Sequence, residues 1–184
     1  QAERDAFGAL VKGRLLAWDP VKQREAWHVE YKGPWNGGTL STAGNLVFPG
    51  TADGKLVAYR ADDGTQLWDF TTQTGVVAPP ISFEMDGEQY VSVNVGWGGA
   101  FALVFGEYVQ AESMPNVSRV LTFKLGGKGA LPAVSWKPTV VFNPPPLEAS
   151  ADKLALGFAT FQDVCMGCHG LHAVSGLLIP DLRG

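Results

Sequence analysis

Five consecutive residues near the end of the chain carry its clearest chemistry: Cys165-Met166-Gly167-Cys168-His169. This stretch contains both cysteines of the chain and one of its three histidines. Two thiols separated by two residues, with a histidine directly after them, form the attachment pattern of a c-type haem. Cys165 and Cys168 would then hold the haem covalently, and His169 would be an axial ligand of its iron. The pattern predicts an electron-transfer site.

Two other sites could use the same thiols. A redox disulfide needs only Cys165 and Cys168, but His169 and the following Gly170 favour haem, and no thioredoxin-like pattern surrounds them. A zinc site completed by His172 would crowd four ligands into eight residues (165–172), which is closer than zinc ligands are normally spaced. Haem therefore remains the preferred interpretation.

A helix is expected to present this motif. Ser150 is a good N-cap residue and Asp152 falls in the first turn. Leu154, Phe158 and Phe161 then recur at helical spacing and continue to the first cysteine, which gives one apolar stripe. The spacing predicts a helix that starts after residue 150 and leads into the haem motif.

A segment rich in glycine and proline precedes the helix. It begins with Gly126-Gly127-Lys128-Gly129 and ends with Asn143-Pro144-Pro145-Pro146. Proline runs favour an extended, semi-rigid chain. We therefore predict three parts: strands in 1–125, a linker in 126–149, and the start of a helical domain in 150–184.

The composition favours strands in the first part and excludes several functions. The 184 residues are 46% hydrophobic and carry a formal net charge of −4 without a basic block, so nucleic acid is not an expected partner. No apolar run is long enough to span a membrane, and no targeting sequence is visible at Gln1. The 23 glycines and 12 prolines favour many short strands and turns. Candidate strands lie at 45–49, 76–83, 89–95 and 101–105.

The first part contains an internal repeat. Gly13-Arg14-Leu15-Leu16-Ala17-Trp18 aligns with Gly54-Lys55-Leu56-Val57-Ala58-Tyr59, and Trp27 aligns with Trp68, at an offset of 41 residues (54 − 13 and 68 − 27). Repeats of this length are typical of propellers and solenoids. Each copy predicts a hairpin whose second strand carries a tryptophan, and we expect both rings to lie between neighbouring sheets. The second turn contains Gly64, whereas the first has Gln23 instead.

These hairpins resemble the tryptophan-docking motif of pyrroloquinoline quinone (PQQ) dehydrogenases. The segments 35–48 (which begins Trp35-Asn36-Gly37-Gly38), 75–80 and 90–99 resemble the quinohaemoprotein alcohol dehydrogenases in particular. The resemblance implies part of an all-β, eight-bladed propeller of four-stranded antiparallel blades. The start of an all-α class I cytochrome c domain would follow, with Pro180 supporting the haem histidine. Two tryptophan repeats do not close a propeller, so the chain is expected to be a C-terminal piece of a longer enzyme.

The same resemblance implies where the quinone would lie. Trp35 and Asn36 would lie beside PQQ, and Trp97, in the glycine-rich stretch after the strand at 89–95, is a further candidate contact. The resemblance also implies a calcium ion and an aspartate base. Their ligands and the base are expected upstream of Gln1, and no residue of this chain is assigned a catalytic role. Asp53, Asp62 and Asp63 are predicted to be solvated turn residues.

Taken together, these features predict oxidation of an alcohol to an aldehyde or ketone with PQQ. Electrons would pass to haem c and then to an external acceptor, namely a cytochrome, a copper protein or a quinone. A covalent haem implies a periplasmic location. A distal methionine is expected beyond Gly184, because Met166 lies between the haem cysteines and Met85 and Met114 belong to the strand region. The chain alone is expected to be inactive. The alternative is a non-enzymatic propeller scaffold with an electron-transfer segment.

Overall fold

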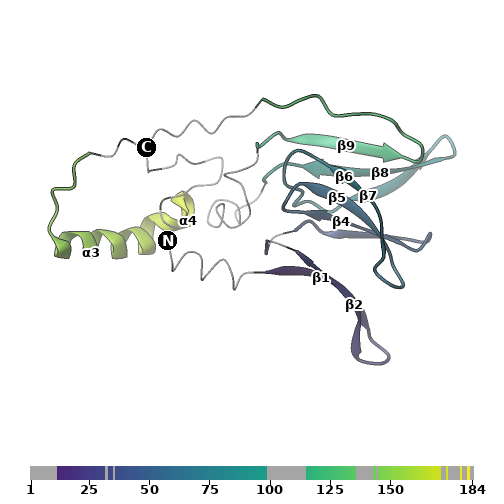
Figure 1. The fold of residues 1–184 in the computed structure, drawn as a ribbon, viewed down its shortest axis with the longest axis horizontal. Helices are drawn as coiled ribbons and strands as arrows, with labels where there is room; N and C mark the ends of the chain where they lie inside the picture. Colours follow the sequence, from purple (N-terminus) through teal and green to yellow (C-terminus); the bar gives the residue numbers. More distant parts are fainter. Residues whose placement is uncertain are drawn as a thin grey trace.

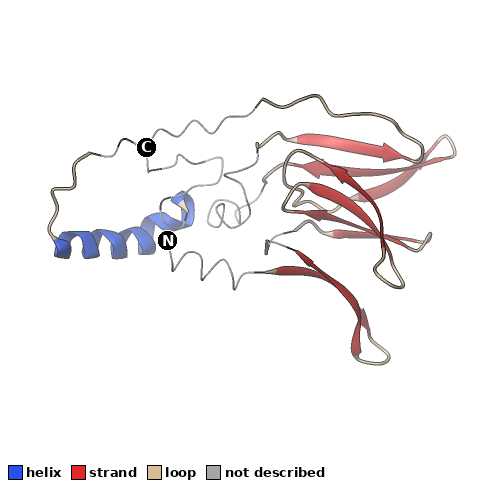
Figure 2. Cartoon of the chain, in the orientation of Figure 1, coloured by secondary structure: helices blue, strands red, loops and turns tan. Residues whose placement is uncertain are grey.

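The computed structural model describes residues 12–31, 33–34, 36–98, 115–135, 143, 145–170, 173, 179 and 182. These residues form antiparallel strands followed by a helical segment (Figures 1 and 2). Trp35, Met114, His172, Pro180 and the predicted strand at 101–105 lie outside the described residues.

The strands form three antiparallel sheets that follow the chain order. The first pairs β1 (Gly13–Asp19) with β2 (Arg24–Tyr31). The second is a four-stranded meander of β3 (Thr39–Thr42), β4 (Leu46–Thr51), β5 (Lys55–Arg60) and β6 (Gln66–Thr71). The third contains β7 (Ile81–Met85), β8 (Glu88–Val95) and β9 (Arg119–Lys124). The second sheet has the form predicted for one propeller blade.

The two repeat copies share one strand register. Trp27 pairs with Ala17 and Trp68 pairs with Ala58, and in both hairpins a β-bulge follows directly after the alanine. The turns agree as well, because Gln23 adopts φ 49° where Gly64 adopts φ 73°. The hairpin therefore imposes a left-handed residue at this position even in the copy that lacks glycine.

The two tryptophans nevertheless have different surroundings. The Trp27 indole Nε1 donates to the carbonyl oxygen of Ala61 in the next sheet, at 2.9 Å. Trp68 packs against Phe70 and Phe123 and is 39% exposed. The predicted equivalence is confirmed for the strand register, and both rings lie against the next sheet as expected. The individual contacts differ, because Trp68 meets Phe123 of β9 whereas Trp27 meets the β5–β6 turn.

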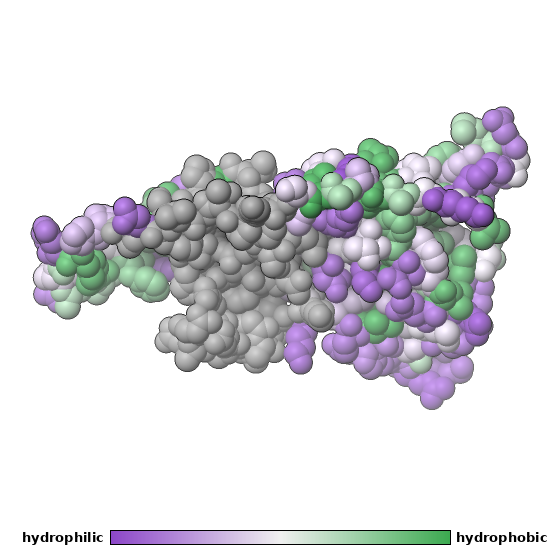
Figure 3. All heavy atoms as spheres, turned by 45° about the horizontal axis from the view of Figure 1, so that its top comes forward, coloured by the Kyte–Doolittle hydropathy of each residue, from purple (hydrophilic) through white to green (hydrophobic). Residues whose placement is uncertain are grey.

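The best-buried core lies between the second and third sheets. Leu56 and Val76 are fully buried, and Val93 and Val95 from β8 pack with them. Side chains on the opposite face of the third sheet remain at the surface, among them Val120. Figure 3 shows such apolar side chains among polar ones over the strand region.

Two of the predicted strands match observed ones, and one needs correction. Residues 45–49 and 89–95 fall largely within β4 and β8. The strand predicted at 76–83 begins only at Ile81. Before it, Val76 forms an isolated parallel bridge with Gly96. Pro79 and Pro80 lack the backbone N–H that a strand ladder requires, so regular pairing starts after them.

The helical segment begins where the sequence predicts. Ser150 caps α3 (Ala151–Thr160), and its hydroxyl accepts a hydrogen bond from the Lys153 N–H at 3.4 Å. A π-helical turn η2 (Phe161–Cys165) and the short α4 (Met166–His169) follow directly. No described residue of α3 is buried, and Phe158 of the predicted apolar stripe is 61% exposed. Among the described residues, no helix is long and apolar enough to cross a membrane.

Candidate functional site

Asn36 lies in the glycine-rich loop that precedes β3, and its side-chain amide is used by the backbone around it. The Oδ1 oxygen accepts a hydrogen bond from the Ala52 N–H at 2.9 Å, and the Nδ2 nitrogen donates to the Gly33 carbonyl at 3.0 Å. The Asn36 side chain thus links its loop by a hydrogen bond to the turn between β4 and β5. The second amide N–H has no acceptor in the described part of the chain and can donate to another group.

The glycines of this loop allow backbones of neighbouring segments to approach each other. The Gly37 N–H donates to the Gly50 carbonyl at 2.9 Å, and a Cβ atom at Gly37 would lie 2.8 Å from the Ala78 carbonyl oxygen. A Cβ atom at Gly38 would lie 2.8 Å from the Cβ of Pro79. The loop at Gly37 and Gly38 is therefore packed closely against β4 and against residues 78–79.

Trp97 is almost completely buried, at 3% exposure. Its ring packs on Gly75, where an added Cβ would lie 2.7 Å from Cζ2 of the indole, and its backbone N–H donates to Oδ1 of Asn116 at 3.1 Å. The indole Nε1 is also buried, and it has no hydrogen-bond acceptor among the described residues. An unpaired buried donor costs about 1–3 kcal/mol, so this position favours a ligand that brings an acceptor.

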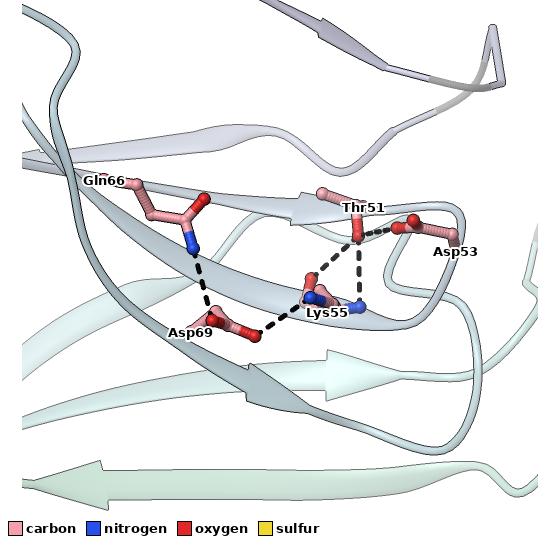
Figure 4. A network of polar contacts seen from close by, with 5 residues as sticks. All are labelled: Thr51, Asp53, Lys55, Gln66 and Asp69. Carbon is pink, nitrogen blue, oxygen red and sulfur yellow. Dashed lines mark hydrogen bonds and ion pairs between the residues drawn. The ribbon is translucent and has the colours of Figure 1, made fainter.

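Asp53 is bonded within its own turn and is not a solvated residue as predicted. Thr51 donates from its hydroxyl to Oδ1 of Asp53 at 2.5 Å, while the Lys55 ammonium pairs with Asp69 at 3.1 Å (Figure 4). The hydrogen bond and charge of Asp69 raise the pKa of Lys55. Asp53 is half-buried, so its carboxylate serves the turn between β4 and β5.

The other predicted turn acids are confirmed as exposed. Asp62 and Asp63 lie in the β5–β6 turn. The carboxylate of Asp63 accepts from the Thr65 N–H and pairs with Arg60, and these contacts lower the pKa of Asp63, the Thr65 backbone bond most.

Two tyrosines lie close to the Asp53 turn. Burial raises the pKa of Tyr31 well above its usual range, and the neighbouring Tyr59 and Asp53 add to this effect. Burial also raises the pKa of Tyr59. Among the described residues, the buried Tyr31 hydroxyl has no hydrogen bond of normal geometry, so its environment favours the neutral phenol.

The haem motif occupies the end of the helical segment. Cys165 closes η2, and Cys168 and His169 lie three and four residues further on, in α4. Helical residues at these spacings share one face, so Cys165, Cys168 and His169 lie on the same face of the helical segment. Neither cysteine forms a disulfide. Gly170 ends the helix with φ 77°, and its N–H donates to the Met166 carbonyl at 2.9 Å.

Comparisons with known proteins agree with this arrangement of strands. Residues 12–91 match the family described as PQQ, glucose/ethanol/alcohol dehydrogenase, beta-propeller domain. The quinohemoprotein alcohol dehydrogenase ADH IIB of Pseudomonas putida is 50% identical over 180 residues, which are 97% of this chain and 26% of that protein. The chain is homologous to the quinohaemoprotein alcohol dehydrogenases.

Other members of this group show the same extent of similarity. The 1-butanol dehydrogenase (cytochrome c) of Thauera butanivorans is 45% identical over 92% of this chain and 24% of its own length. The solved structure of the quinohemoprotein alcohol dehydrogenase ADHIIG from Pseudomonas putida HK5 superposes with a TM-score of 0.83, at 46% identity, over 94% of this chain and 25% of that one. The enzyme from Comamonas testosteroni superposes with a TM-score of 0.76, at 44% identity, over 94% of this chain and 24% of that one. The chain therefore spans about a quarter of the length of the quinohaemoprotein relatives.

Sequence reasoning missed the residues that hold Trp97 in place. Asn116 lies 19 positions further along the chain and gives no local signal. Gly75 belongs to a segment that the family resemblance covers, but its contact with the indole depends on two different loops meeting. The roles of Trp35, Asn36 and Trp97 toward a quinone stay predictions.

Proposed function

We propose that this chain is part of a PQQ- and haem c-dependent alcohol dehydrogenase that oxidises alcohols to aldehydes or ketones. The observation that carries the proposal is one chain that combines blades of a PQQ-dehydrogenase propeller with Cys165, Cys168 and His169 on one helical face. A propeller that served only as a scaffold would not need this electron-transfer motif, so the non-enzymatic alternative is disfavoured.

Three residues are proposed to contact the quinone. Trp97 brings a buried indole N–H that has no acceptor among the described residues, which fits the carbonyl and carboxylate oxygens of PQQ. Asn36 offers its remaining amide N–H, from a side chain already fixed at Gly33 and Ala52. Trp35 is included on the family resemblance alone. When bound, PQQ supplies a two-electron acceptor for the alcohol, and the task of these residues is to orient it.

The helical segment is proposed to begin a class I cytochrome c domain. Cys165 and Cys168 would carry the thioether bonds to haem c, and His169 would bind the iron from the same helical face. The half-buried Cys165 and the exposed Cys168 are free of disulfides, which fits covalent attachment. Haem c supplies a one-electron acceptor when it is bound.

The remaining parts of the proposal rest on the family. The catalytic base and the calcium ligands are placed upstream of Gln1, so no residue of the chain is proposed as catalytic. The external acceptor is a cytochrome, a copper protein or a quinone, and the location is periplasmic because covalent haem attachment belongs to that compartment.

A spectroscopic experiment tests the function. The complete gene product is reconstituted with PQQ and calcium, and the haem α-band is followed as a primary alcohol is added. We expect the band of reduced haem to appear in the wild type and to be absent in the Cys165→Ala, Cys168→Ala double variant. A wild-type haem that stays oxidised while bound quinone is present would contradict the proposal. Residues 1–184 alone should show no alcohol oxidation.

A further inference from the structure

The connection between β6 and β7 is held rigidly by its neighbours. Thr72 and Thr74 are fully buried, and the Thr72 hydroxyl donates to the Thr74 carbonyl at 2.6 Å. The Thr72 N–H donates to the Gly54 carbonyl at 2.9 Å. Gln73, between the two threonines, adopts φ 64° and is half-buried. The backbone thus directs the Gln73 side chain away from the buried threonines.

The Gln73 amide joins two distant parts of the chain. Its Oε1 oxygen accepts from Nη1 of Arg119 at 2.8 Å, and its Nε2 nitrogen donates to the Pro132 carbonyl at 3.2 Å. Pro132 lies 59 positions away, in the segment rich in glycine and proline. Leu131 and Val134 on either side of it are half-buried, so this part of the segment lies against other residues.

Only a side chain that both accepts and donates can make these two bonds. An amide meets this need, whereas a carboxylate accepts only. Arg119 is half-buried and forms no ion pair with a carboxylate among the described residues. Its hydrogen bond to Gln73 is therefore a charge-assisted contact that fixes the amide orientation.

The same connection supports the proposed quinone contact. Gly75 accepts a hydrogen bond on its carbonyl from the Gly96 N–H at 2.8 Å, and the Trp97 ring packs on Gly75. Residues 72–75 therefore contact the Trp97 ring through Gly75 and the Pro132 carbonyl through Gln73. This one connection contacts both the proposed quinone residue and the linker.

We propose that Gln73 is a positioning residue that pins the linker to the propeller and so limits the separation of the quinone and haem segments. This inference rests on the proposed function. With residue 132 pinned, the tether beyond the pin is 133–149, which is 17 of the 24 residues of 126–149. Since the effective concentration of tethered partners falls roughly as the −3/2 power of linker length, release of the pin lowers it about 1.7-fold.

The test uses the full-length protein and two matched glutamine variants. Gln73→Glu keeps an acceptor for Arg119 and removes the donor to the Pro132 carbonyl, so it releases the linker while it preserves the fold. Gln89→Glu makes the same chemical change in the exposed β7–β8 hairpin, where the Gln89 amide donates to the Ser82 hydroxyl at 2.9 Å and does not reach the linker segment around Pro132. Hydrogen exchange of linker peptides around residues 126–135 and stopped-flow reduction of quinone and haem are measured in each protein.

In Gln73→Glu we expect linker exchange to be about fivefold faster, as for the loss of one hydrogen bond, and haem reduction to be about 1.7-fold slower. Quinone reduction by alcohol should not change, and Gln89→Glu should match the wild type. Unchanged linker exchange would refute the pin, and faster exchange with unchanged haem reduction would refute its positioning role. A wild type without alcohol-driven haem reduction would refute the proposed function, while exchange would still decide whether Gln73 holds the linker.

Discussion

The contact between Trp27 and the next hairpin gives a sharp test at Gly64. Gly64 adopts φ 73°, and a Cβ atom there would lie 2.7 Å from Cε3 and 2.8 Å from Cδ2 of the Trp27 ring. The indole also donates to the Ala61 carbonyl at 2.9 Å. The ring therefore occupies the space that any side chain at position 64 would need.

Gly64→Ala should have two separate costs. A left-handed backbone costs a non-glycine residue about 1–2 kcal/mol, and the overpacked contact with Trp27 costs about 1–3 kcal/mol. Together they should lower the free energy of unfolding by about 2–5 kcal/mol, reduced by about 0.4–1 kcal/mol because alanine restricts the unfolded chain. Gly87 separates the two costs, because it has φ 76° but nothing within 4 Å of an added Cβ.

Urea unfolding of the full-length protein measures the difference. Gly64→Ala should be less stable than Gly87→Ala by about 1–3 kcal/mol, the cost of the contact alone. In a Trp27→Ala background this difference should disappear, because the ring is no longer there to be displaced. Equal stability of the two glycine variants, or a difference that persists without Trp27, would refute the docking argument.

Three further changes test the site. Asn36→Ala leaves the buried Ala52 N–H unpaired and should lower the free energy of unfolding in urea by about 1–3 kcal/mol, whereas Asn36→Asp keeps the acceptor and should lose less. Gly75→Ala places a Cβ 2.7 Å from the Trp97 ring and should weaken PQQ binding in a fluorescence titration; unchanged affinity would remove Trp97 from the quinone site. Because burial raises the pKa of Tyr31 above that of an unfolded tyrosine, at about 10, the folded protein binds more protons and loses stability as the pH rises above about 10. Tyr31→Phe should remove part of this loss when urea midpoints at pH 8 and pH 11 are compared, and an unchanged loss would contradict the assignment.

Local patterns were sufficient for the hairpins and the haem motif. The 41-residue repeat (54 − 13) predicted both hairpins because alternating strands and turn residues act over a few positions. The helix from Ala151 followed from the Ser150 cap and the apolar spacing. Cys165, Cys168 and His169 share a helical face for the same reason, since spacing along a helix fixes direction.

Contacts between blades were not accessible from local patterns. Trp27 and Trp68 have the same strand register. Their contacts differ because Trp27 meets the β5–β6 turn of the second sheet, whereas Trp68 meets Phe123 of the third sheet. Asp53 looked like a fully solvated turn residue, but it is half-buried and accepts a hydrogen bond from the Thr51 hydroxyl.

The sequence by itself determined the repeated hairpins, the capped helix and the electron-transfer motif, because each depends on residues a few positions apart. Tertiary structure decided which polar groups already have hydrogen-bond partners and which do not. The Asn36 amide is bonded to the backbone, the buried Trp97 indole N–H has no acceptor in the part of the chain that the structure describes, and Gln73 reaches Pro132. These contacts join segments that meet only when the blades pack, so no local pattern encodes them.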